Sequence, residues 1–199
     1  MGYQHLIGFK ECDKEQMIIL VGESGSGKST IEKILDEKYG YKKTVSYTTR
    51  PQREGEKDGV DYNFIHADDF AKKFNDGYFV EVGAYRDWWY GTREVQYSKE
   101  TVCVLTPHGL RQIKKNLKNQ DDLDIHTFYI KVPRRDRLIK MLQRGDDVDE
   151  CIRRNQSDVG QFDGIEDEVD YVLCNVRYRN TPEEMVEKIL EFIESEKGE

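Results

Sequence analysis

The sequence predicts an α/β fold in which a mainly parallel sheet is flanked by helices. Apolar, strand-like segments alternate with helix-like segments along most of the chain. Residues 101–105 form a nearly continuous apolar run, which is typical of a strand buried on both faces of a parallel sheet. A glycine-rich turn also follows the first apolar run, residues 17–21, and leads into a helix-like segment.

The glycine-rich turn reads GESGSGKS over residues 22–29 and has the pattern of a phosphate-binding P-loop. Its glycines let the backbone fold around a polyphosphate, so that successive N–H groups face the oxygens. The start of the following helix adds unpaired N–H donors and a partial positive charge. We therefore predict a P-loop NTPase core whose ATP-binding residues are Gly22, Glu23, Ser24, Gly25, Ser26, Gly27, Lys28, Ser29 and Thr30.

Two residues at the end of the turn are expected to act on the phosphates. Lys28 is predicted to bridge the β- and γ-phosphates and so to be catalytic. The Ser29 hydroxyl is predicted to ligate Mg²⁺, which takes oxygen ligands and retains several waters. The cofactors implied by this turn are therefore ATP and Mg²⁺.

The helices and strands after the turn are predicted from the spacing of apolar residues and from the glycines that end some of these elements. The first helix is expected over residues 28–38 and should stop near Gly40. The next part of the chain is predicted to contain three short strands and one helix, at residues 43–47, 62–65, 78–82 and 67–75. Gly83 and Gly91 are expected to bracket an aromatic loop. Because this part breaks the alternation, we interpret residues 44–95 as a small mixed α/β subdomain inserted into the core, which can carry a second substrate site.

The second half of the chain returns to the alternating pattern. Strands are predicted at 127–132 and 171–175, and helices at 109–118, 135–144 and 149–160. A last helix should begin at Pro182, because Thr181 and Glu184 have the spacing of a capping box. We predict one domain over residues 1–199, with a core at 16–43 and 100–199 and a helical, arginine-bearing lid at 134–160.

Composition narrows the class of protein. The 199 residues carry a formal net charge of −8, which argues against a general nucleic-acid surface. No apolar stretch approaches the ~20 residues of a membrane span, and the first fifteen residues are too polar for a signal sequence. Cys12, Cys103, Cys151 and Cys174 are widely scattered. We expect a cytoplasmic protein, monomeric or homodimeric, that binds neither nucleic acid nor membrane.

A charged stretch in the predicted subdomain holds a second candidate site. Arg50 and Arg53 lie three residues apart, and Tyr62 follows nine residues later. Arginine forks match phosphate oxygens, and a tyrosine hydroxyl adds a further donor. The alternative is an ordinary solvated charged loop, and the arginines by themselves leave both interpretations open.

The wider pattern resembles the guanylate kinase family. Residues 46–64 match every specified position of its signature, S-x-T-T-R-x-x-R-x-G-E-x-x-G-x-D-Y-x-F. Residues 90–92 match the family's Y-G-[ST], and 79–81 precede them at a suitable distance. The P-loop also fits, with Glu23 where proline is usual. The resemblance covers nearly the whole chain in the order of its elements.

The resemblance implies roles for individual residues. Glu81 would accept hydrogen bonds from the N1–H and N2–H edge of guanine, while Ser46 would donate to O6. The subdomain would bind the acceptor of the phosphoryl group, a nucleoside monophosphate. Its phosphate and base would be held by Ser46, Arg50, Arg53, Tyr62, Glu81, Tyr90, Gly91, Thr92 and Thr106. Asn175 would contact the adenine of ATP. Lid arginines, with Arg144, Arg153 and Arg154 as candidates, would stabilise the transferring phosphoryl group; alternatively they balance neighbouring acids on solvated helices.

One departure from the family pattern stands out. The family usually carries a D-x-D pair at the end of the third parallel strand, where Val104 and Thr106 stand here. Either Mg²⁺ is then held by Ser29, phosphates and water, or the acceptor is not a standard guanine nucleotide.

Three functions follow from these motifs. The leading hypothesis is ATP-dependent phosphorylation of a nucleoside monophosphate, GMP or dGMP. The first alternative is a kinase for another or a modified deoxynucleoside monophosphate. The second is a non-catalytic guanylate kinase-like binding module, although such modules typically lack the P-loop residues found here at Lys28 and Ser29.

Overall fold

A computed structural model describes residues 15–53, 55–85, 87–93, 100–117 and 123–196. The expectations for the polar N-terminus and for Cys12 fall outside these residues, as do residues 94 and 95 at the end of the predicted subdomain.

The larger sheet has five parallel strands in the order β2-β7-β1-β8-β9. These strands are β1 (Glu15–Val21), β2 (Lys42–Lys43), β7 (Glu100–Leu105), β8 (Leu123–Lys131) and β9 (Tyr171–Cys174). Strand β1 is central, and its residues 17–21 are fully buried. The prediction of a parallel α/β sheet is confirmed.

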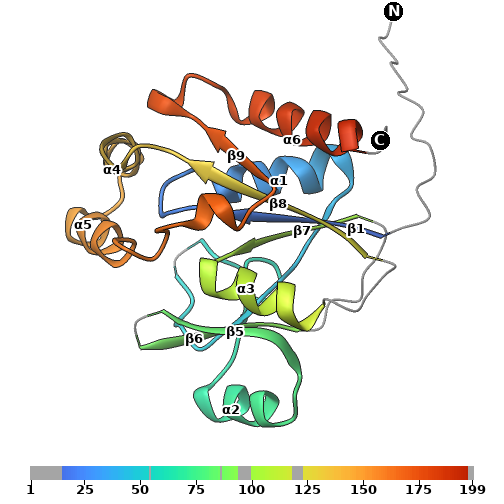
Figure 1. Ribbon diagram of the computed structural model, residues 1–199. Helices are drawn as coiled ribbons and strands as arrows, with labels where there is room; N and C mark the ends of the chain where they lie inside the picture. The colour runs from blue at the N-terminus through green and yellow to red at the C-terminus, as the bar shows by residue number, and fades with distance from the viewer. Residues whose placement is uncertain (1–14, 54, 86, 94–99, 118–122, 197–199) are drawn as a thin grey trace, which may run out of the picture.

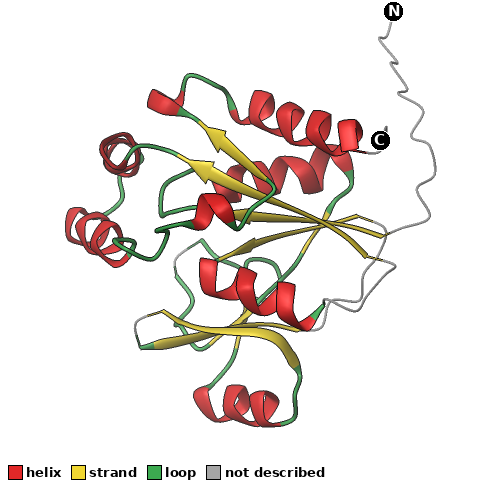
Figure 2. Cartoon of the chain, in the orientation of Figure 1, coloured by secondary structure: helices red, strands yellow, loops and turns green. Residues whose placement is uncertain are grey.

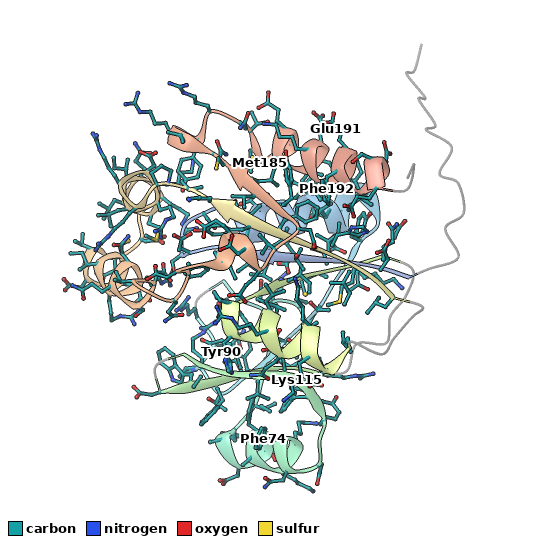
Figure 3. All side chains as sticks on the ribbon, viewed as in Figure 1. Phe74, Tyr90, Lys115, Met185, Glu191 and Phe192 are labelled. Carbon is teal, nitrogen blue, oxygen red and sulfur yellow. The ribbon has the colours of Figure 1, made fainter. Side chains whose placement is uncertain are left out.

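Helices cover both faces of this sheet (Figure 1). Helices α1 (Lys28–Tyr39) and α6 (Pro182–Glu196) lie on one face, and α3 (Pro107–Asn116) lies on the other. Side chains of β1 alternate between them: Ile18 and Leu20 join the α1–α6 core, while Ile19 joins the α3 core. Figure 3 shows Met185 and Phe192 on the side of α6 that faces the sheet, with Glu191 on the outer side.

The predicted start of the last helix agrees with its hydrogen bonds. The Thr181 N–H donates to Glu184 Oε2 at 2.8 Å, and the Glu184 N–H donates to Thr181 Oγ1 at 3.2 Å. This reciprocal pair satisfies two of the donors that a helix leaves open at its start.

A second sheet lies beneath α3 in Figure 1 and has the strand order β4-β3-β6-β5. Its strands are β3 (Tyr47–Thr48), β4 (Asn63–Phe64), β5 (Phe79–Tyr85) and β6 (Trp88–Arg93). Helix α2 (Ala67–Asn75) has the predicted bounds and packs through Phe70, whose ring stacks on Phe79 at 4.7 Å. Phe74, at helical spacing from Phe70, is instead exposed.

Two local predictions in this region are wrong. The expected strand at 43–47 is split, because Lys43 pairs with β7 in the larger sheet while Tyr47 pairs with β6 in the smaller one. The expected aromatic loop between Gly83 and Gly91 is an antiparallel hairpin. Glycine is required at position 91 for close packing and not for a backbone turn, because an added Cβ would lie 2.9 Å from the Phe79 ring.

The predicted lid segment, residues 134–160, carries two helices, α4 (Arg134–Gln143) and α5 (Val148–Ser157), which lie at the left of the molecule in Figure 1 and in the matching view of Figure 2. A short 3₁₀ turn, η1 (Ile165–Asp167), leads from them to β9, and η2 (Val176–Tyr178) follows β9. Helix α3 starts two residues earlier than predicted, because Thr106 caps it and Pro107 fits its first turn. In the described part of the chain, no helix has both the length and the apolar character needed to span a bilayer.

Candidate active site

The P-loop connects β1 to α1 through two glycines in the left-handed region. Gly25 has φ of 81° and Gly27 has φ of 101°, conformations that other residues adopt at a cost. Gly22 is constrained differently: an added Cβ would lie 2.8 Å from the Ile130 carbonyl oxygen. The sequence therefore places glycine where either the backbone turn or close packing demands it.

Lys28 lies across this loop. Its Nζ donates to the carbonyl oxygens of Gly22, at 2.6 Å, and Glu23, at 3.0 Å. Burial lowers the pKa of Lys28 to about 8, although the nearby Asp158 and Glu23 carboxylates act in the opposite direction. The ammonium group is thus held at the loop by two backbone carbonyls, with a longer contact of 3.4 Å to Ser26 Oγ.

Ser29 is exposed at the start of α1. Among the described residues, no group of three or more His, Cys, Asp or Glu side chains is arranged to hold a metal ion. A magnesium ion here would take the Ser29 hydroxyl together with phosphate oxygens and water. This donor set fits Mg²⁺, which dehydrates reluctantly and needs few protein ligands.

A buried ionic network that sequence reasoning missed ties the P-loop to the lid segment. Arg137 of α4 is 4% exposed and donates to Glu23 Oε1 at 3.2 Å and to the Ser24 carbonyl at 3.2 Å. Asp158 accepts from the Ser24 N–H at 2.9 Å, and the Tyr129 hydroxyl donates to Glu23 Oε2 at 3.1 Å. Glu23, where the family pattern has proline, is thereby a structural partner of Arg137.

A cavity of about 480 Å³ lies beside this network. Glu23, Arg134, Arg137, Asp158 and Phe162 are among the residues that line it. It therefore borders the donor side of the site, between the P-loop and the segment after α5.

Arg137→Met is expected to lower the free energy of unfolding by about 3 kcal/mol, because Glu23 and Asp158 would lose their buried countercharge. Urea denaturation measures the loss. Arg135→Met on the same helix is the matched control, since Arg135 is exposed; it should change stability by about 0.5 kcal/mol or less. Equal losses in the two variants would mean that the network does not stabilise the fold.

A second cluster gathers the predicted phosphate-binding residues of the charged stretch. Arg50 is buried, pairs with Glu56 Oε1 at 2.7 Å, and lies 5.4 Å from the centroid of the Tyr62 ring. Tyr90, labelled on β6 in Figure 3, is in turn 5.9 Å from Tyr62 between ring centroids. The solvated-loop alternative for Arg50 is inconsistent with this burial.

Arg53 lies at the open side of the same cluster. Its Nη2 is 3.7 Å from Glu150 Oε1 of α5, so this arginine touches the lid segment. Burial lowers its pKa, and the positive charges of Arg50 and Arg154 act in the same direction. The guanidinium groups of Arg50, Arg53 and Arg154 lie close enough to repel one another. Their combined positive charge would favour a bound anion.

A short chain of hydrogen bonds adjoins the cluster. Thr92 Oγ1 donates to Glu81 Oε1 at 2.6 Å, and the Ser46 hydroxyl lies 3.0 Å from Thr92 Oγ1. Glu81 is buried, which raises its pKa, although the bonds from Thr92 act against that rise. Because the Thr92 proton is given to Glu81, Ser46 must donate to Thr92 here and would have to turn to donate elsewhere.

The surroundings of Glu81 also include a glycine at the start of α3. A Cβ added to Gly109 would lie 2.9 Å from Glu81 Oε2. The α3 N-terminus can therefore approach the carboxylate only without a side chain at this position. Gly91 lies on β6, which pairs with the strand of Glu81, and its close contact is with the Phe79 ring.

Comparison with known proteins places the chain in a family. The guanylate kinase family model matches residues 14–196. The chain belongs to the guanylate kinase family. It is accordingly a nucleoside monophosphate kinase that uses ATP, so the non-catalytic alternative is wrong.

Curated guanylate kinases are similar in sequence to this chain over most of their length. The guanylate kinase of Mycoplasmopsis pulmonis (strain UAB CTIP) is 31% identical over 189 residues, which covers 90% of this chain and 94% of that protein. The guanylate kinase of Legionella pneumophila (strain Paris) is 32% identical over 167 residues, covering 80% and 78% respectively. A crystal structure of guanylate kinase from Anaplasma phagocytophilum shares the fold, with a TM-score of 0.67 at 20% identity over 93% of this chain and 87% of that one.

The three arginines predicted to act from the lid all pair with acids of their own segment. Arg144 Nε donates to Asp146 Oδ1 at 2.8 Å, and Arg154 Nε donates to Glu150 Oε1 at 2.8 Å. Arg153 also pairs with Glu150. In this arrangement the arginines are balanced by acids, and a catalytic role requires that they exchange those partners for phosphate.

The remaining predicted contacts have structural partners. Both ends of the Asn175 amide bond to Asn180, at 3.0 and 3.1 Å, in the loop after β9. Thr106 Oγ1 accepts from the Gly109 N–H at 3.1 Å, which caps α3. Val104 packs against the core shared by α1 and α6. The end of β7 therefore offers one capping hydroxyl and an apolar side chain.

Proposed function

We propose that this kinase transfers the γ-phosphoryl group of ATP to GMP or dGMP. The observation that carries the proposal is the buried carboxylate of Glu81, paired with Thr92 beside the Arg50–Tyr62–Tyr90 cluster. A carboxylate that faces two adjacent N–H groups selects guanine, because adenine presents no such pair.

The two nucleotides would occupy opposite ends of the site. ATP would bind at the P-loop amides and Lys28, while the acceptor phosphate would bind to Arg50, Arg53, Tyr62 and Tyr90. Ser46 and Gly91 would complete the base pocket with Thr92, and Asn175 would contact the adenine. Held in line, the acceptor phosphate attacks without a strong base, since its oxygen is already anionic.

The chain's own residues would supply most of the stabilisation of the charge on the transferring phosphoryl group. Lys28 neutralises charge on the β- and γ-phosphates, and Arg144, Arg153 and Arg154 reach the transferring group as the lid closes. The Ser29 hydroxyl would hold Mg²⁺, which would supply positive charge to offset that of the phosphates. Closure also excludes water, which prevents hydrolysis of ATP.

An acceptor panel tests the substrate. ADP release is measured by a coupled assay with ATP, Mg²⁺ and each common ribo- and deoxyribonucleoside monophosphate. GMP or dGMP is expected to be the best acceptor by at least ~10-fold, the discrimination of one good charged hydrogen bond. No ADP release above background with any acceptor would overturn the proposal. A different best base would favour a kinase for another or a modified deoxynucleotide.

We propose further that the protein works in the cytoplasm as a monomer or homodimer. The three cysteines within the described residues, Cys103, Cys151 and Cys174, are free thiols, as suits a reducing compartment. Sedimentation equilibrium distinguishes the two oligomeric states.

A further inference from the structure

Glu32 is a buried carboxylate beside the catalytic machinery that the function described above does not use. It is 5% exposed and lies on α1 one turn after Lys28 and Ser29. Residues at i and i+4 of a helix share a face, and helical side chains lean toward the N-terminus. The Glu32 side chain therefore leans toward the end of α1 that opens the P-loop site.

The surroundings of Glu32 do not neutralise it well. Its ion pair is with Lys43 of β2, whose Nζ lies 3.8 Å from Oε2, a long contact for a buried charge. Burial raises the pKa of Glu32 to about 7, with Asp36 acting in the same direction and Lys43 and Lys28 opposing it. The ionised form of the Glu32 carboxyl group therefore lowers the stability of the folded state.

Glu32 also acts on residues of the acceptor side. Burial is the main cause that raises the pKa of Tyr62, in the acceptor-phosphate cluster, and of Cys103 on β7, and the negative charge of Glu32 adds to both shifts. Helix α1 packs against β2 and against β7, which carries Val104 next to its last residue. Glu32 thus lies where its field reaches both the donor residue Lys28 and the acceptor residue Tyr62.

The buried neighbours of Glu32 on α1 are apolar, so an apolar side chain would also suit position 32. Ile31, Ile34 and Leu35 are buried in the apolar core. An apolar side chain at position 32 would bury surface without desolvating a charge. Retention of a costly carboxylate next to a site is a common mark of functional residues.

We propose that Glu32 is a positioning residue that supplies, from α1, the negative charge that β7 lacks at Val104 and Thr106. Resting on the proposed phosphoryl transfer, its role is to accept hydrogen bonds from the water shell of the metal at Ser29. Ordered water in turn orients the donor phosphates toward the acceptor. Partners of this kind beside a metal ligand typically change metal affinity by roughly 10–100-fold.

The test measures metal binding without turnover. Mn²⁺ affinity is determined by electron paramagnetic resonance in the presence of a non-hydrolysable ATP analogue. Glu32→Gln is expected to weaken Mn²⁺ binding by ~10-fold, while Glu32→Asp, which keeps the charge, should lose less. Wild-type Mn²⁺ affinity in Glu32→Gln would overturn the proposal. Since no acceptor is present, this result is independent of the guanine preference measured by the acceptor panel.

A second-site variant separates charge from packing. Thr106→Asp restores a carboxylate at the end of β7 and keeps a helix-capping residue there. In the Glu32→Gln background it should recover most of the Mn²⁺ affinity, whereas the neutral cap Thr106→Asn should not. Equal behaviour of the two double variants would overturn the proposal.

Stability provides the check on folding. The pKa of Glu32 is raised in the folded state, so its ionisation destabilises the protein as pH rises from about 4.5 to about 7. Glu32→Gln should therefore melt a few degrees above wild type at pH 8 and at a similar temperature at pH 4. A gain in Tm accompanied by weaker Mn²⁺ binding is the combination that a merely structural residue would not give.

Discussion

Replacing Lys28 by alanine is expected to lower kcat by ~10² or more while the fold persists. The ammonium group would be lost from the charge that develops on the transferring phosphoryl oxygens, an interaction worth roughly 3 kcal/mol or more. The fold should tolerate the change, because Nζ bonds to the Gly22 and Glu23 carbonyls and Ser26 Oγ at a loop that water can reach. Steady-state kinetics with ATP and GMP, together with thermal melting, measure the two effects.

Lys33→Ala on the same helix is the control for Lys28→Ala. The Lys33 side chain is 69% exposed and forms a surface pair with Glu37, so the variant should retain wild-type kcat. Unchanged activity in Lys28→Ala would remove Lys28 from the mechanism.

The pKa of Lys28 adds a pH dependence to this prediction. Burial lowers it to about 8, so in the nucleotide-free enzyme the ammonium form is complete well below pH 8 and is lost as pH rises through 8. ATP affinity of the wild type should therefore fall above pH 8 more steeply than that of Lys28→Ala. Calorimetric titration between pH 7 and pH 9 measures it, and parallel profiles would contradict the assignment.

Glu81→Gln is expected to lower kcat/KM for guanine nucleotides by roughly 10–100-fold and to leave AMP turnover nearly unchanged. The carboxylate offers two acceptors to the guanine edge, whereas an amide turns one of them into a donor that opposes an N–H. A charged hydrogen bond is worth about 1.5–3 kcal/mol, which sets the size of the loss. Kinetics with GMP, dGMP and AMP measure the change in preference.

The fold should survive the substitution at Glu81. Glutamine is isosteric and can still accept from Thr92, and its neutrality removes the burial cost that raises the Glu81 pKa. Asp69→Asn, an exposed change on α2 in the same region, should leave both activity and preference unaltered. An equal loss for all three acceptors would contradict a role in base selection.

Local patterns in the sequence were sufficient for several elements. The P-loop, the strand ending at Val21 and the helix Ala67–Asn75 depend on spacing, glycine conformation and periodicity within a few residues. The charged signature likewise led to Arg50 and Tyr62, which the fold brings together. Where the chain passes from one sheet to the other, between Lys43 and Tyr47, periodicity alone could not reveal that two different strands pair with two different partners.

The sequence by itself therefore determined the chemistry of the donor loop and the family to which the chain belongs, because both are encoded in short, contiguous motifs. Only the tertiary structure decided how Glu23, Arg137 and Asp158 share one network, although over a hundred residues separate Glu23 from the others. The same is true of Glu32, which looks like a surface charge on a helix until packing against β2 and β7 buries it. Burial and partner choice are properties of contacts distant in sequence, and these govern which charged groups are stabilised and which are held at a cost.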